Sequence, residues 1–168
     1  MSPLLQWRRP AYIAAGFSGV FALSLLLLQP LLIAGLLPGL SRLGSRRFHK
    51  FVGGVLVLLV VAHVFGLWLT SPPDVIDALL LVSPTPFSIW GVLAMWCLFA
   101  AAILVALRSR IPIPAHRWRQ VHRILVGVTV IGSVIHALMI EGAMGTISKI
   151  ILCAIVVLTA GYVLSRKT

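Results

Sequence analysis

Two pairs of histidines lie inside long apolar stretches of this sequence, and both pairs have the same internal spacing. His49 and His63 are fourteen residues apart, and so are His122 and His136. In an α-helix, fourteen residues advance the chain by roughly 21 Å and return the side-chain direction to within roughly 40° of its start. Each pair therefore places two imidazoles on one side of one helix, near its opposite ends. Two such helices side by side would form two His–His sites at different depths.

Imidazole binds iron, copper, nickel and zinc, and the spacing of the histidines decides among these metals. A zinc site needs several ligands around one ion, usually from close spacings such as i, i+4. Histidines roughly 21 Å apart cannot share an ion, and pairing across two helices supplies only two protein ligands per site. Two axial ligands complete the coordination of a haem iron, and an iron filled on both sides transfers electrons rather than binding oxygen. The spacing thus predicts haem iron held at each site by one histidine from each helix.

Simpler interpretations of the same histidines remain open. Ionisable residues deep in a membrane usually mark function, but His63 and His136 could instead bond to helix carbonyls. His49 and His122 lie close to basic segments, where contact with lipid headgroups is a second explanation. A haem-free membrane anchor or assembly subunit is therefore one alternative function. A small transporter that uses the histidines as a proton relay is another.

The composition predicts the membrane helices that would have to position these side chains. The chain has 168 residues, of which 60% are hydrophobic and only 10% are charged, and its mean hydropathy is +1.09. A soluble domain of this size would be far more polar. The expected fold is all-α, an integral membrane helical bundle that forms a single domain over residues 1–168. The stretches long enough to span a bilayer are about 11–37, 46–70, 87–107, 118–140 and 146–164.

The charge distribution predicts the orientation of this bundle. Five spans would place eleven basic residues on one side of the membrane. The other side would have three basic residues and all three acidic residues. Lys and Arg concentrate in the cytoplasmic loops of membrane proteins. The basic loops and the C-terminus, with Arg166 and Lys167, are therefore expected on the cytoplasmic side of a bacterial inner membrane. Topology accounts for the net charge of +11 without a nucleic-acid partner, and the sequence contains no nucleotide-binding motif.

Basic and small residues surround the histidines. Guanidinium groups near them could pair with haem propionates, although the topology alone explains most of these arginines. The arginines concerned are Arg46, Arg47, Arg117, Arg119 and Arg123. Glycines between the paired histidines leave room either for a flat ring or for close helix packing. These glycines are Gly53, Gly54, Gly127 and Gly132.

Two segments resemble a known family. RRFHK, which contains His49 and is followed by His63, and RWRQVHRILVGVTVIGSVIH, which ends at His136, are similar to the ferric reductase-like transmembrane domain. That family includes NADPH oxidases, yeast ferric reductases and the haem subunit of the bacterial methionine sulfoxide reductase system. The resemblance covers about residues 15–162. It implies b-type haem held by His49, His63, His122 and His136, and electron flow outward across the membrane.

The resemblance also implies a set of partners. The larger members carry a C-terminal FAD/NADPH domain, whereas this sequence ends at Thr168, so it looks more like the short bacterial members. These take electrons from a separate flavoprotein or from quinol. We therefore expect an oxidoreductase subunit in which electrons enter at the His49/His122 haem and leave from the His63/His136 haem. The expected acceptor is ferric iron, a periplasmic protein or oxygen, and membrane lipid is a further partner.

Overall fold

The computed structural model describes residues 8–165 and contains six α-helices within this range. Five of these helices are long and apolar enough to cross a membrane, which confirms the predicted all-α membrane bundle. They are α1 (Pro10–Ala34), α2 (Arg42–Trp68), α4 (Pro86–Ala106), α5 (Ala115–Met139) and α6 (Thr146–Ser165). The part of the chain that the structure describes has no β-strand. Arg166 and Lys167, which were expected on the basic side, lie outside the described residues.

Local sequence signals explain where the first two helices end and begin. Gly35 follows the last residue of α1 with a φ of 67°, a left-handed conformation that ends a helix at little cost for glycine. α2 begins at Arg42, four residues earlier than the sequence predicts. The reason is Ser41, whose Oγ accepts a hydrogen bond of 3.1 Å from the Gly44 N–H and caps the new helix.

A short helix, α3 (Pro72–Leu79), connects α2 with α4 and was not predicted. The sequence Ser71-Pro72-Pro73 predicts the end of the preceding helix, because a proline disfavours helical geometry in the residue before it. The same prolines occupy the first two positions of α3, where their fixed φ favours a helix start. α3 is too short to span a bilayer, so the number of membrane crossings remains five.

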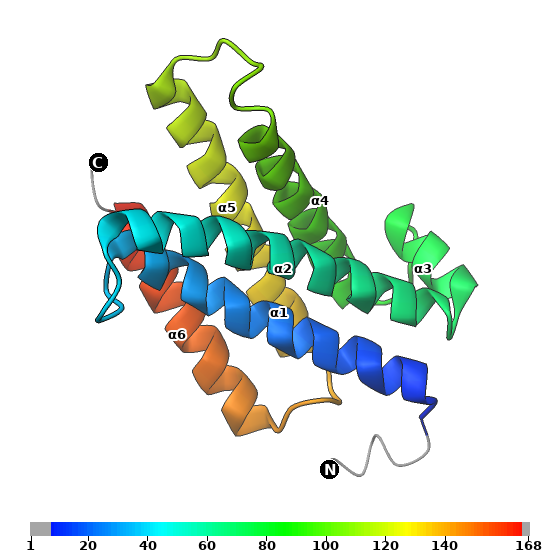
Figure 1. Ribbon diagram of the computed structural model, residues 1–168. Helices are drawn as coiled ribbons and strands as arrows, with labels where there is room; N and C mark the ends of the chain where they lie inside the picture. The colour runs from blue at the N-terminus through cyan, green and yellow to red at the C-terminus, as the bar shows by residue number, and fades with distance from the viewer. Residues whose placement is uncertain (1–7, 166–168) are drawn as a thin grey trace.

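Two antiparallel hairpins, α1–α2 and α4–α5, form the main body of the bundle, and α6 packs against α5 and α1. The two hairpins cross each other in Figure 1. α2 packs mainly on α1, and α5 packs mainly on α4, rather than α2 packing directly on α5. Buried residues from several helices, including Leu26, Leu56, Val130 and Val156, form the core. The two histidine-bearing helices are thus each supported by a hairpin partner.

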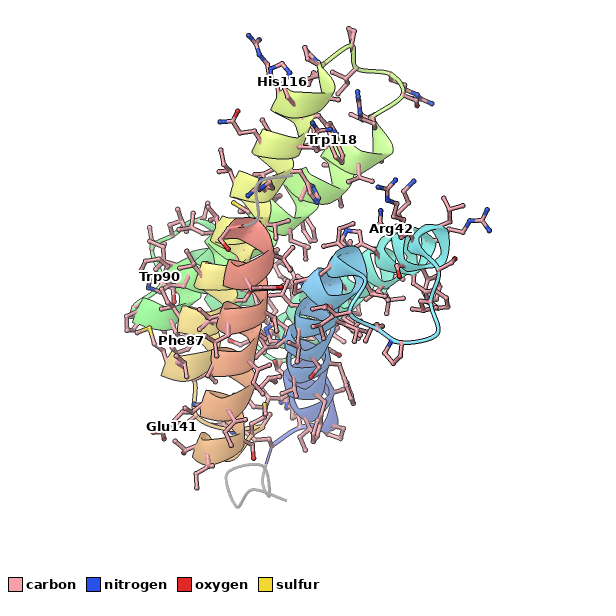
Figure 2. The ribbon with its side chains drawn as sticks, turned by 90° about the vertical axis from the view of Figure 1, so that its left-hand side faces the viewer. Arg42, Phe87, Trp90, His116, Trp118 and Glu141 are labelled. Atoms are coloured by element: carbon pink, nitrogen blue, oxygen red, sulfur yellow. The ribbon has the colours of Figure 1, made fainter. Side chains whose placement is uncertain are left out.

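The connections between the spans alternate between two sides of the bundle. The α1–α2 loop, the α4–α5 loop and the end of α6 lie toward the upper left of Figure 1, and α3 and the α5–α6 turn lie toward the lower right. Figure 2 shows Arg42, His116 and Trp118 toward one end of the molecule and Glu141 at the other. The basic loops therefore share one side, as five spans require.

Candidate functional site

His63 of α2 and His136 of α5 face each other between the two hairpins. Their ring centroids are 6.4 Å apart, and the ring planes are nearly perpendicular, at 87°. Both side chains are partly buried. The sequence predicts that these two residues lie at the same depth, and the structure brings them together.

A helix carbonyl holds each of these two rings from behind. His63 Nδ1 lies 2.7 Å from the Ala15 carbonyl oxygen of α1, and His136 Nδ1 lies 2.8 Å from the Phe87 carbonyl oxygen of α4. Because a carbonyl oxygen can only accept, each Nδ1 must carry the proton and donate it. The neutral ring then keeps a free lone pair on Nε2. This is the tautomer and the support that metal-ligating histidines usually have.

The spacing of the two rings suits one metal atom between them. An imidazole nitrogen lies about 2 Å from the metal it binds. Two such bonds, together with the distance from each nitrogen to its ring centre, bring the centroids to about 6 Å apart, and the observed value is 6.4 Å. Among residues 8–165, no group of three or more His, Cys, Asp or Glu side chains could form a metal cage. The pair therefore fits a metal whose remaining ligands come from a macrocycle such as haem.

His49 of α2 and His122 of α5 lie nearer the basic loops, and we call them the second pair. The two side chains interact electrostatically. The His122 ring stacks on the Trp118 ring, with centroids 5.3 Å apart and an interplanar angle of 4°. Trp118 also donates a hydrogen bond of 3.2 Å from Nε1 to the Leu104 carbonyl oxygen. Trp118 is thus a direct neighbour of a candidate ligand.

The hydrogen bonds of this second pair do not fix its tautomers. His49 Nδ1 lies 3.3 Å from the Gln29 carbonyl oxygen, and the Gln29 side-chain amide contacts the same nitrogen. A carbonyl requires a protonated Nδ1, whereas an amide N–H requires an unprotonated one. Either tautomer of His49 therefore finds a partner on Gln29. His122 Nδ1 is buried and has no hydrogen-bond partner.

Unsatisfied polar atoms gather at the level of this second pair. Within the described part of the chain, two buried side-chain polar atoms lack a partner, His122 Nδ1 and Ser45 Oγ. Ser45 precedes His49 by one helical turn and therefore lies on the same face of α2. Buried polar atoms are normally hydrogen-bonded, so this end of the bundle suits a bound group that brings its own polar atoms. The sequence gives no signal for Ser45, because its role depends on burial.

Residues 11–133 match the model of the family described as ferric reductase like transmembrane component. The chain belongs to this family. No curated protein and no solved structure matches the chain. Proteins of the ferric reductase-like family generally bind haem, and the family suggests a role in membrane electron transfer. The matched range includes His49, His63 and His122, and it ends three residues before His136.

Glycines on the supporting helices let the ferric reductase-like bundle close around its histidines. Gly19 follows Ala15 by one turn of α1, and Gly91 follows Phe87 by one turn of α4. A Cβ atom at Gly19 would lie 3.0 Å from His63 Nδ1, and one at Gly91 would lie 2.6 Å from His136 Nδ1. Any side chain there would push the ring away from its carbonyl. These two positioning residues were missed, because only the packing of the hairpins reveals them.

The glycines that the sequence singles out, those between the paired histidines, have other surroundings. A Cβ at Gly132 would lie 2.8 Å from the Trp90 carbonyl oxygen, so this glycine serves close helix packing. A Cβ at Gly53 would lie 3.2 Å from Gln29 Nε2, and one at Gly127 would only touch Leu164 at 4.0 Å. A Cβ at Gly54 would meet nothing within 4 Å.

The arginines expected near propionates divide into two groups. Four of them are exposed, namely Arg46, Arg47, Arg117 and Arg119. Arg123 is partly buried, and its Nη2 donates to the Leu164 carbonyl oxygen at the end of α6. Arg123 therefore joins α5 to α6 in this structure.

Lys149 is buried in the first turn of α6. Its Nζ donates to the Ile140 carbonyl oxygen at 2.5 Å and to the Leu138 carbonyl oxygen at 3.3 Å. These carbonyls lie at the end of α5, where the last oxygens of a helix lack partners within it. Lys149 thus stabilises the end of α5 about one turn beyond His136.

Proposed function

We propose that this chain is a membrane cytochrome b subunit that passes electrons across the bilayer through bis-histidine haem. The observation that carries the proposal is the His63–His136 geometry, with ring centroids 6.4 Å apart and both Nδ1 atoms donating to helix carbonyls. This arrangement leaves the Nε2 lone pair of each ring free to bind a metal. When bound there, haem would supply a one-electron iron couple.

In this proposal His63 and His136 would hold one haem, and His49 and His122 would hold a second. A haem iron held by two histidines would transfer electrons rather than bind oxygen at the metal. Ser45 Oγ would find a partner in the polar edge of the second group. Arg46, Arg47 and Arg117 are the candidates to pair with propionates, and the family membership supports haem as the cofactor.

We further propose the orientation and the partners of the chain. The shared side of the basic loops supports placing them in the cytoplasm of a bacterial inner membrane. The His49/His122 site would then face the electron donor, a flavoprotein or quinol. The His63/His136 site would face ferric iron, a periplasmic protein or oxygen as the acceptor. The chain would work as an oxidoreductase subunit with a separate donor.

The test is a reduced-minus-oxidised absorbance spectrum of the purified protein, combined with a pyridine haemochrome assay of haem per chain. A b-type spectrum with two haems per chain supports both sites. One haem per chain would limit the proposal to the His63/His136 pair. Protein that contains no haem, although expressed with an adequate haem supply, would overturn the proposal in favour of a haem-free anchor or a proton relay.

A further inference from the structure

Two hollows lie along the seam between α5 and α6. The first has a volume of about 390 Å³ and lies where α5 begins and α6 ends. It is lined by His116, Arg119, Gln120, Arg123, Ile124 and Leu164. We call it the basic hollow. It lies at the end of α5 that carries His116 in Figure 2.

The basic hollow has the chemistry of an anion site. Arg119 and Arg123 are one helical turn apart, so both guanidinium groups lie on the same face of α5. Arg123 is fixed by its hydrogen bond to the Leu164 carbonyl oxygen, and Gln120 adds an amide donor. No acidic residue lines the hollow. Guanidinium groups bind phosphate oxygens through directed, charge-assisted hydrogen bonds.

The second hollow continues the same seam within the membrane. Its volume is about 400 Å³, and its lining is apolar, with Val134 and Leu138 of α5 opposite Ile150 and Val157 of α6. We call it the apolar hollow. Ten residues of α5 separate Ile124 from Val134, a rise of about 15 Å, which is close to half the thickness of the hydrocarbon core.

An exposed apolar stripe on α5 connects the two hollows. Ile124, Val128 and Ile131 are all exposed, and their i, i+4, i+7 spacing places them on one helix face. The seam therefore offers cationic groups at headgroup level and an unbroken apolar path from there to the middle of the membrane. This is the pattern of a ligand with an anionic head and a long hydrocarbon chain.

We propose that the α5–α6 seam binds one anionic phospholipid. Its phosphate lies on Arg119 and Arg123, and one acyl chain runs along Ile124, Val128 and Ile131 into the apolar hollow. A soluble anion would use the basic hollow alone, and an acidic protein surface would not reach the apolar hollow. Basic pockets between transmembrane helices bind anionic headgroups in the same way.

If Arg119 and Arg123 bind a lipid phosphate, they are not available to pair with haem propionates at the histidine sites. Arg119 and Arg123 are offset from His122 by about 60° and 100° around the helix, in the same direction. The contact of Arg123 with Leu164 shows that its side chain turns toward α6. The lipid site does not depend on haem binding, so the two proposals can fail separately.

The test measures lipid binding to the full-length protein after delipidation in detergent. Native mass spectrometry would count bound phosphatidylglycerol and, in parallel, phosphatidylcholine. We expect one tightly bound phosphatidylglycerol per chain and an Arg119→Gln variant with about tenfold weaker affinity, the loss expected for one charge-assisted hydrogen bond. Arg119 is chosen because it is exposed, whereas Arg123 also joins α5 to α6. The matched control is Arg42→Gln, an exposed arginine on the same side of the bundle that lines neither hollow.

An equal loss in Arg42→Gln, or no loss in Arg119→Gln, would overturn the proposal. A second variant, Ala154→Phe, fills the apolar hollow that Ala154 lines and should weaken phosphatidylglycerol binding. If Ala154→Phe binds phosphatidylglycerol as the wild type does, and inorganic phosphate stabilises the wild type against heat as much as phosphatidylglycerol does, the basic hollow is a site for a soluble anion instead. A haem spectrum recorded on Arg119→Gln provides the last comparison. A changed spectrum with unchanged lipid affinity would assign Arg119 to the haem and also contradict the lipid site.

Discussion

The two histidine pairs are carried by the same two helices, yet the structure supports them very differently. In the His63/His136 pair, both Nδ1 atoms have carbonyl partners at 2.8 Å or less. In the His49/His122 pair, the best carbonyl contact is 3.3 Å, and His122 Nδ1 has no partner. The first pair is held in one tautomer and one direction by its surroundings. The second is not.

This difference has an energetic consequence. Ligands whose tautomer and orientation are already fixed lose little freedom when they bind a metal. A buried polar group without a partner destabilises a protein by about 1–3 kcal/mol, and the His49/His122 end has two such groups. Binding there would therefore stabilise the fold itself. We infer that the His63/His136 site is preorganised and that the His49/His122 site is completed by what it binds.

Removing a ligand from the preorganised pair should have the largest effect. We expect His63→Ala to lose one haem per chain, because a single remaining axial imidazole holds haem weakly. His122→Ala should lose the other haem and leave the His63/His136 component of the spectrum unchanged. The measurement is the pyridine haemochrome assay with a reduced-minus-oxidised spectrum. His116→Ala is the control, since His116 is exposed in the first turn of α5. Loss of both components in either ligand variant would show that the pairs are not independent.

Crowding the preorganised pair without removing a ligand should have the next largest effect. In Gly91→Ala the new Cβ would lie 2.6 Å from His136 Nδ1, so the ring must leave the Phe87 carbonyl. Overpacking of this kind destabilises by about 1–3 kcal/mol, and we expect loss of the His63/His136 haem. Gly19→Ala should act in the same direction but less strongly, because its Cβ would lie 3.0 Å from His63 Nδ1.

Gly54→Ala is the matched control for both glycine variants. A Cβ there meets nothing within 4 Å, and alanine favours a helix over glycine by about 1 kcal/mol. This variant should therefore keep its haem and unfold at an equal or higher temperature. Haem content and the thermal midpoint would be measured for all three proteins. Equal loss of haem in the control would mean that helix glycines matter in general and that the support of the rings is not specific.

The preorganisation could be predicted only in part from the sequence. The fourteen-residue spacing and the apolar stretches depend on positions along one helix, so they predict five spans and the pairing of His63 with His136. The support of each ring depends on a helix far along the chain, since Ala15 and Phe87 precede their histidines by 48 and 49 residues. No local pattern distinguishes Gly19 and Gly91 from other helix glycines.

Lys149 and Ser45 were missed for a related reason. Lys149 lies close to the start of its helix, and its position along the chain does not indicate burial. The structure buries it because its long side chain reaches the free carbonyls at the end of α5. Ser45 reads as an ordinary residue in the first turn of α2, and only its burial without a partner makes it informative. Both roles depend on tertiary contacts that side-chain spacing does not encode.

Loosening the second pair should have a smaller effect than crowding the first. Trp118→Leu removes the ring that stacks on His122, a contact worth about 0.5–1.5 kcal/mol. We expect the His49/His122 haem to dissociate more readily in a haem-transfer assay, with the His63/His136 component unaffected. Trp118→Phe keeps the stacked ring but loses the hydrogen bond to the Leu104 carbonyl. If Trp118→Phe retains haem as the wild type does, ring stacking is what holds His122 in place. If Trp118→Phe loses haem as Trp118→Leu does, the hydrogen bond to Leu104 is what holds it.

The smallest change, Ser45→Ala, tests whether the second pair is completed by its ligand, because the expected sign depends on the bound state. In haem-free protein the substitution removes a buried hydroxyl without a partner, so stability should stay equal or rise by about 1 kcal/mol. In haem-loaded protein the hydroxyl should have gained a partner, and its removal should destabilise by a similar amount. Thermal unfolding of both forms measures this difference, with Ser18→Ala as the control for a partly buried serine whose hydroxyl already has a partner. The same sign in both states would mean that Ser45 does not contact the bound group, and the inferred contrast between the two pairs would then rest on His122 alone.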